Sequence, residues 1–175
     1  MTKKKNNIYN TCDVFATLCA TYIADADAED SVCIPGYEDA GDVQMMRAIE
    51  IAEDLGYDEI EFTDKLEDAV IKIGEMDERE WEEYKAEVTS FVNRDKARMV
   101  MEGMIDVALC YGYINEMIIN IILSDVELLG ESVEIATLLI ARRCQEETTI
   151  AIDTASMDEE RKIMIASNMH GPGEA

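Results

Sequence analysis

Apolar residues recur at helical spacing along most of the chain. From Thr11, a residue suited to a helix N-cap, they fall three and four positions apart and line one face of a helix that should end near Asp30. Pro35 and two glycines predict a loop over 31–42. Residues 57–62 alternate apolar and acidic side chains without an obvious partner strand, so they are interpreted as a linker. The further helices predicted are 43–55, 65–76, 78–93, 97–109, 114–123, 126–129, 133–145 and 156–169.

Capping boxes predict several of these helix starts. In this motif a short polar side chain accepts a hydrogen bond from the backbone three positions later, and a Glu at that position reaches back. The sequence contains four such pairs that precede apolar runs, and residues 148–152 are β-branched and expected to be extended. The four pairs are Asp64 with Glu67, Asp77 with Glu80, Ser124 with Glu127, and Ser156 with Glu159.

The most apolar segment predicts the centre of the fold. Residues 97–109 are apolar on almost every side, which is typical of a helix surrounded by others. With 114–123 they should form a central helical hairpin over about 95–123. The predicted fold class is therefore all-α, a compact bundle of about eight short helices around this hairpin.

Length and composition favour one domain. A chain of 175 residues with 48% hydrophobic content can bury one sizeable core without disulfides or metal. The predicted boundaries are a basic disordered N-terminus at 1–7, a single domain at 8–170 with an acidic subregion (25–87) and an apolar core and assembly subregion (95–169), and a tail at 171–175.

Acidic residues are concentrated in one part of the sequence. The chain has 39 Asp plus Glu against 15 Lys plus Arg, a net charge of -24. Residues 25–87 contain 23 acidic and 5 basic residues, so -18 of that charge lies in about a third of the chain. Such a balance argues against binding nucleic acid or an anionic membrane through a basic face. The partner expected is a basic, nucleic-acid-binding protein.

Like charges recur four positions apart in this subregion, for example at Asp64 and Asp68, although each pair is mildly destabilising. Rows of carboxylates on rigid helices resemble a nucleic-acid backbone in scale. By physical analogy, this favours an inhibitor that mimics DNA, of the kind with which phages and mobile elements block restriction, CRISPR or repair enzymes. The residues predicted to form the partner-binding acidic face are Glu50, Asp54, Asp58, Glu61, Asp64, Asp68, Glu78, Glu82 and Glu83.

Three other interpretations compete with this one. Acidic helices are commonly solvated faces that maintain solubility. A MazG-like, all-α, metal-dependent nucleoside-triphosphate pyrophosphohydrolase would use ExxE and ExxD motifs, for which Glu50 with Glu53 and Glu61 with Asp64 are candidates, although they lie too close in sequence for the required return helix. A helical assembly protein would oligomerise, for example as a homodimer, through Met99, Met101, Met104 and Met117, whose default role is core packing.

Candidate catalytic chemistry is scarce. The five cysteines are odd in number and lack a CxxC pair, so they are expected to be reduced thiols of a cytoplasmic protein, in the host cytoplasm if phage-encoded. The one histidine, His170, follows the last predicted helix. The sequence therefore predicts no catalytic residues, no metal site and no cofactor.

Overall fold

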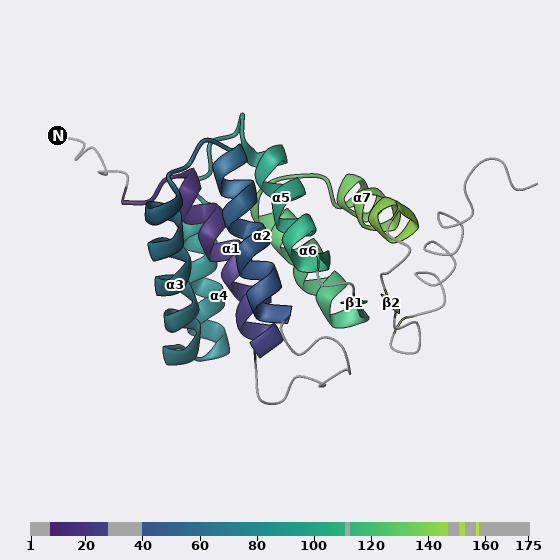
Figure 1. Ribbon diagram of the computed structural model, residues 1–175, viewed down its shortest axis with the longest axis horizontal. Coiled ribbons are helices and arrows are strands. Elements are labelled where there is room, and N and C mark those ends of the chain that lie inside the picture. Colours follow the sequence, from purple (N-terminus) through teal and green to yellow (C-terminus); the bar gives the residue numbers. More distant parts are fainter. Residues whose placement is uncertain (1–7, 28–39, 111–112, 147–150, 153–156, 158–175) are drawn as a thin grey trace, which may run out of the picture.

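The computed structural model describes residues 8–27, 40–110, 113–146, 151–152 and 157 (Figure 1). Their two short strands pair in parallel, with Tyr113 opposite Ala151 and Ile114 opposite Ile152. The all-α class is confirmed, with seven helices in these residues against about eight predicted. The elements are α1 (Thr11–Asp27), α2 (Ala40–Asp54), α3 (Glu59–Glu75), α4 (Glu78–Thr89), α5 (Ala97–Leu109), β1 (Tyr113–Ile114), α6 (Glu116–Leu128), α7 (Val133–Glu146) and β2 (Ala151–Ile152).

Several predictions lie outside the described residues. They are the helix over 156–169, the termini at 1–7 and 171–175, and residues 31–39 of the loop predicted over 31–42. The loop prediction is wrong for residues 40–42, which belong to α2. In the part of the chain that the structure covers, no helix has the length and apolar character needed to cross a membrane.

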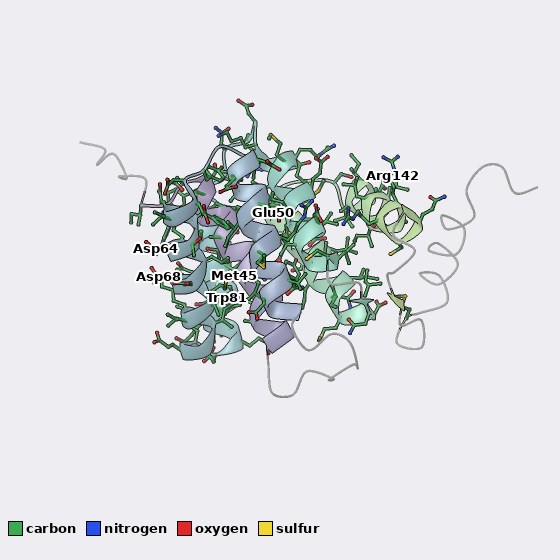
Figure 2. All side chains as sticks on the ribbon, viewed as in Figure 1. Met45, Glu50, Asp64, Asp68, Trp81 and Arg142 are labelled. Atoms are coloured by element: carbon green, nitrogen blue, oxygen red, sulfur yellow. The ribbon has the colours of Figure 1, made fainter. Side chains whose placement is uncertain are left out.

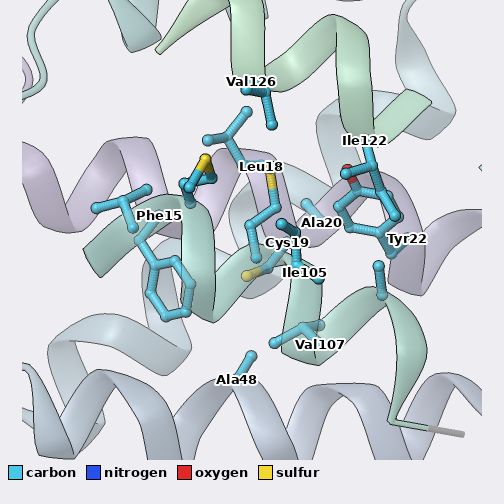
Figure 3. Packing of buried hydrophobic residues seen from close by; sticks show 14 of the residues in the cluster. Phe15, Leu18, Cys19, Ala20, Tyr22, Ala48, Ile105, Val107, Ile122 and Val126 are labelled. Atoms are coloured by element: carbon cyan, nitrogen blue, oxygen red, sulfur yellow. The ribbon is translucent and has the colours of Figure 1, made fainter. Parts of the chain in front are cut away.

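The most enclosed helix is α1, which corrects the prediction that the 95–123 hairpin forms the centre. α1 contacts α2, α3, α4 and α5. Between Thr11 and Ile23 only Asp13 and Thr21 escape burial. The positions off the apolar stripe are small, such as Ala16 and Ala20, so neighbouring helices can approach from several sides. Figure 3 shows α1 side chains packed among residues of α2, α5 and α6.

α5 is the second buried helix, and a glycine allows its close approach to α1 and α2. A Cβ atom placed on Gly103 would lie 3.0 Å from Ile51 Cγ2 and 3.1 Å from Phe15 Cε2. The predicted range of α5, 97–109, agrees with the structure. α6 is less enclosed, because only one side of it is buried. The hairpin is therefore part of the core without being its axis.

The linker predicted over 57–62 is wrong from residue 59 onward, because α3 begins there. Asp58 is the N-cap, and its side chain accepts a hydrogen bond from the Glu61 backbone at 2.9 Å. Asp64 therefore lies inside a helix and caps nothing, which corrects the first capping box. Phe62 and Leu66 are buried where α3 packs on α1, and the helix begins six residues before its predicted start.

Of the two other predicted capping boxes that lie within the described residues, one is present and one is absent. The Asp77 and Glu80 box is present at the start of α4, which ends at Thr89 rather than at residue 93. The Ser124 box is absent, because α6 runs without a break from Glu116 to Leu128 and is capped by Asn115. Gly130 then ends this segment with φ +70°, a left-handed conformation that favours glycine.

Candidate functional site

The acidic subregion folds mainly into α2, α3 and α4. Figure 1 shows α3 and α4 side by side at one end of the bundle, with α7 at the other end. A hydrogen bond of 3.0 Å from Lys72 to the Tyr84 hydroxyl joins α3 to α4. Asp64 and Asp68 lie on the outer flank of α3 (Figure 2). Carboxylates of the three helices can therefore face solvent together.

Every acidic side chain between residues 40 and 89 is exposed, 17 in all. The structure thus places all nine predicted residues on the outside of these helices and of the turns between them. We call the full set the acidic surface. It consists of Glu50, Asp54, Asp58, Glu61, Asp64, Asp68, Glu78, Glu82 and Glu83, together with Asp42, Glu53, Glu59, Glu67, Glu75, Asp77, Glu80 and Glu87.

Basic side chains of the same segment turn inward. Of the five, only Arg79 is exposed, whereas Lys85 is buried and the other three are half-buried. Lys65 Nζ lies 2.6 Å from Asp13 Oδ1 on α1, and Arg47 Nη2 lies 2.7 Å from Asp106 Oδ2 on α5. These two cations also pair with Glu50 and Glu61 of the acidic surface, at 2.9 and 3.9 Å, so each joins a carboxylate at a helix interface to an exposed one.

Five of the nine predicted carboxylates also have local structural roles. Glu50, Glu61, Glu82 and Glu83 form ion pairs within their own helices, at N to O distances of 2.9, 3.9, 3.1 and 3.1 Å, and Asp58 caps α3. The remaining four form no ion pair and cap no helix within the described residues. Those four are Asp54, Asp64, Asp68 and Glu78.

Crowding of like charges is visible where α2 meets α3. The carboxyl group of Glu53 hydrogen-bonds that of Glu59, and this contact, together with repulsion from Glu59, raises the pKa of Glu53. Such a contact requires that one of the two groups keep its proton. Sequence spacing did not single out Glu59, because the linker prediction placed it outside a helix.

A buried ion pair anchors the acidic helices to the core. Lys85 of α4 lies against Asp125 of α6, which also accepts a hydrogen bond of 3.0 Å from the hydroxyl of Tyr22 on α1. Burial opposes the charge on Lys85, but Asp125 and Glu82 outweigh it and raise the pKa of Lys85. Burial also raises the pKa of Asp125, partly offset by Lys85 and Tyr22. This network sets how α4 sits on the bundle.

A second polar cluster joins α2, α5 and α7, and Arg47 links it to Glu50 of the acidic surface. Asp106 accepts hydrogen bonds from Arg47 and Arg143, the latter at 3.0 Å. A cavity of about 300 Å³ adjoins it. The cavity is lined by Glu102, Ile105, Asp106, Leu139, Arg142 and Arg143.

The four methionines proposed for an oligomer interface are not brought together on one surface. Met101 and Met104 are fully buried within the chain and belong to its core. Met99 on α5 and Met117 on α6 are exposed. Of the four proposed residues, only Met99 and Met117 therefore lie at the surface of the chain.

The described residues offer few candidates for metal binding or thiol chemistry. These contain no group of three or more His, Cys, Asp or Glu side chains placed to hold a metal ion. Burial raises the pKa of Cys12, Cys110 and Cys144 to about 11, so their thiolates form only at high pH. Cys33 and His170 lie outside the described residues.

Comparison with known proteins adds no relative. No protein family model, curated protein or solved structure matches the chain. Its function must therefore be argued from the arrangement of its own side chains, and the acidic surface is the feature that distinguishes it most.

Proposed function

We propose that this chain is a non-catalytic binding protein, an inhibitor encoded by a phage or mobile element that mimics nucleic-acid charge and blocks a DNA-binding or host-defence enzyme. One observation carries the proposal. All 17 acidic residues of 40–89 face solvent, while four of the five basic residues turn inward. The exposed side of this segment is thus strongly acidic, and its few basic residues lie mostly at the helix interfaces.

The spacing of the carboxylates supports this interpretation. α3 has 17 residues and carries six exposed acidic residues, so at a helical rise of about 1.5 Å per residue it presents one for every ~4 Å of its length. α4 has 12 residues and five exposed acidic residues, which gives a similar spacing of about 3.6 Å. A DNA strand carries one phosphate for every ~3.4 Å. Lys and Arg side chains placed to contact phosphates could therefore meet these carboxylates instead.

Charge reversal at positions without structural roles tests the proposal. The variant D54K/D64K/D68K changes three exposed carboxylates that make no ion pair or cap in the described structure. Lys is a good helix former and suits the C-terminal end of α2, where Asp54 lies, so the fold should persist. The matched control is E102K/E127K/E134K, which reverses three exposed carboxylates on α5, α6 and α7.

The readout is inhibition of DNA binding by three purified enzymes: a type I restriction enzyme, a Cas9–guide RNA complex and a DNA-repair glycosylase. We expect the wild-type protein to compete with duplex DNA for at least one of them at about 0.1 M salt and less well at ~0.5 M, because salt screens the contacts. The control should retain inhibition and D54K/D64K/D68K should lose it, with both variants equally helical by circular dichroism. Equal inhibition by the two variants, or no inhibition of any enzyme, would contradict the proposal.

A further inference from the structure

Two isoleucines lie on the side of α3 that faces solvent. Ile60 is 72% exposed and Ile71 is 57% exposed. They are eleven residues apart, which on a helix separates them by about 16 Å along the axis and by only ~20° around it. The residues of α3 that pack into the core, Phe62, Leu66 and Ala69, lie on the opposite side.

Carboxylates occupy the space between these isoleucines. Asp64 lies one turn after Ile60, and Glu67 lies one turn before Ile71, so the four side chains form a single row along the helix. All four are exposed. The order along the row is apolar, acidic, acidic, apolar. An amphipathic helix packed on one side needs no apolar side chains at the centre of its solvent side.

The surrounding charge restricts what can cover this row. A second copy of the chain would bring its own acidic helices against those of the first, and like charges brought together without counterions repel. A neutral apolar surface would remove water from the carboxylates without pairing them, which is unfavourable. A surface that offers apolar contacts flanked by Lys or Arg satisfies both kinds of side chain. Charge complementarity therefore indicates a basic protein.

We propose that Ile60 and Ile71 are the apolar anchors through which the acidic surface docks in the nucleic-acid-binding groove of its partner, an inference that rests on the function proposed above. The carboxylates supply attraction that depends on salt. The isoleucines supply burial of apolar surface, which salt does not screen. Two anchors at a defined separation would make the protein prefer a particular groove over an arbitrary cationic surface.

The variant I60S/I71S tests this inference. Ser and Ile have similar helix propensities and both side chains are exposed, so α3 should be retained. The matched control is M117S/L138S, which removes two exposed apolar side chains from α6 and α7. Dissociation constants would be measured against the same three enzymes between about 0.1 and 0.3 M salt, with poly-L-lysine as a probe that offers charge without a groove.

We expect I60S/I71S to bind the inhibited enzyme about a hundred-fold more weakly, since each of the two buried isoleucines contributes on the order of a factor of ten. The slope of log affinity against log salt should stay unchanged, and poly-L-lysine binding should equal that of the wild type. Wild-type affinity of I60S/I71S, or equal losses in M117S/L138S, would overturn the anchor role while leaving the acidic mimic intact. Unimpaired binding by D54K/D64K/D68K, or no enzyme bound, would overturn both.

Discussion

Lys85 Nζ and Asp125 Oδ1 lie 2.8 Å apart, and the two side chains are 2% and 0% exposed. Lys85 lies on α4, and Asp125 lies on α6, forty residues later in the sequence. A buried ion pair adds little net stability to a protein. Removing one of its two residues is nevertheless strongly destabilising, because the other charge is left buried without a partner. The pair therefore makes the docking of α4 dependent on both residues.

Removing one member of this pair should destabilise the fold strongly. We expect Lys85→Met or Asp125→Asn to lower the free energy of unfolding by about 3–5 kcal/mol, because each leaves a buried polar group unsatisfied. The double variant K85M/D125N should lose less than the sum of the two single losses. Urea denaturation would measure all three. The exposed pair of Arg79 and Glu83 provides the control, since Arg79→Met should leave stability almost unchanged. Additive losses in the double variant would argue against a coupled pair.

Stability should fall as the pH rises from about 9 to 11. The pKa of Cys12, Cys110 and Cys144 is raised from 9.0 to about 11 in the fold. In this range the unfolded chain loses these protons while the native chain keeps them, so the unfolded state is favoured with increasing pH. The contribution is fully present below pH 9 and lost through pH 11.

Urea unfolding under reducing conditions at pH 8, 9, 10 and 11 would measure this loss. The variant C12A/C144A should show a shallower decline, with Cys110 still contributing. A decline as steep as that of the wild type would show that other groups govern the alkaline limit, for example Tyr22, whose pKa burial and Asp125 raise well above its ordinary value.

Two glycines in helices should respond in opposite directions to a larger side chain. Gly103→Val places atoms where Ile51 and Phe15 already pack, and overpacking of this kind costs about 1–3 kcal/mol. Gly74→Ala meets no atom within 4 Å and should stabilise α3 by up to about 1 kcal/mol through helix propensity. Thermal and urea unfolding of the two variants would check both signs. A stable Gly103→Val would mean that α5 packs less closely on α1 and α2 than described.

The start of α3 can be tested by comparing two aspartates. Asp58→Ala removes the N-cap and should cost about 1 kcal/mol. Asp64→Ala removes no cap and relieves repulsion with Asp68, so it should be neutral or stabilising. Urea unfolding compares the two directly. If Asp64→Ala were the more damaging change, the helix would begin at residue 65.

Local sequence patterns predicted an element correctly where a single pattern indicated it. The range of α5 and the capping box of Asp77 and Glu80 were both readable from the sequence. Such patterns failed where tertiary packing decided the helix start. The sequence pattern predicted Asp64 as the cap, whereas the structure has Asp58, and the residues between them include Phe62, which is buried. The excess of acidic residues could be counted from the sequence, but which carboxylates are exposed could be seen only in the structure.

The sequence by itself determined the helical class and the concentration of negative charge, because periodicity and composition are local properties of the chain. Only the tertiary structure decided which helix lies at the centre and where the basic residues point. Lys85 and Asp125 meet because α4 and α6 both pack near α1, and no spacing in the sequence encodes that contact. Burial is a collective property of packed helices, so the outward segregation of acidic charge emerged only when the bundle was assembled.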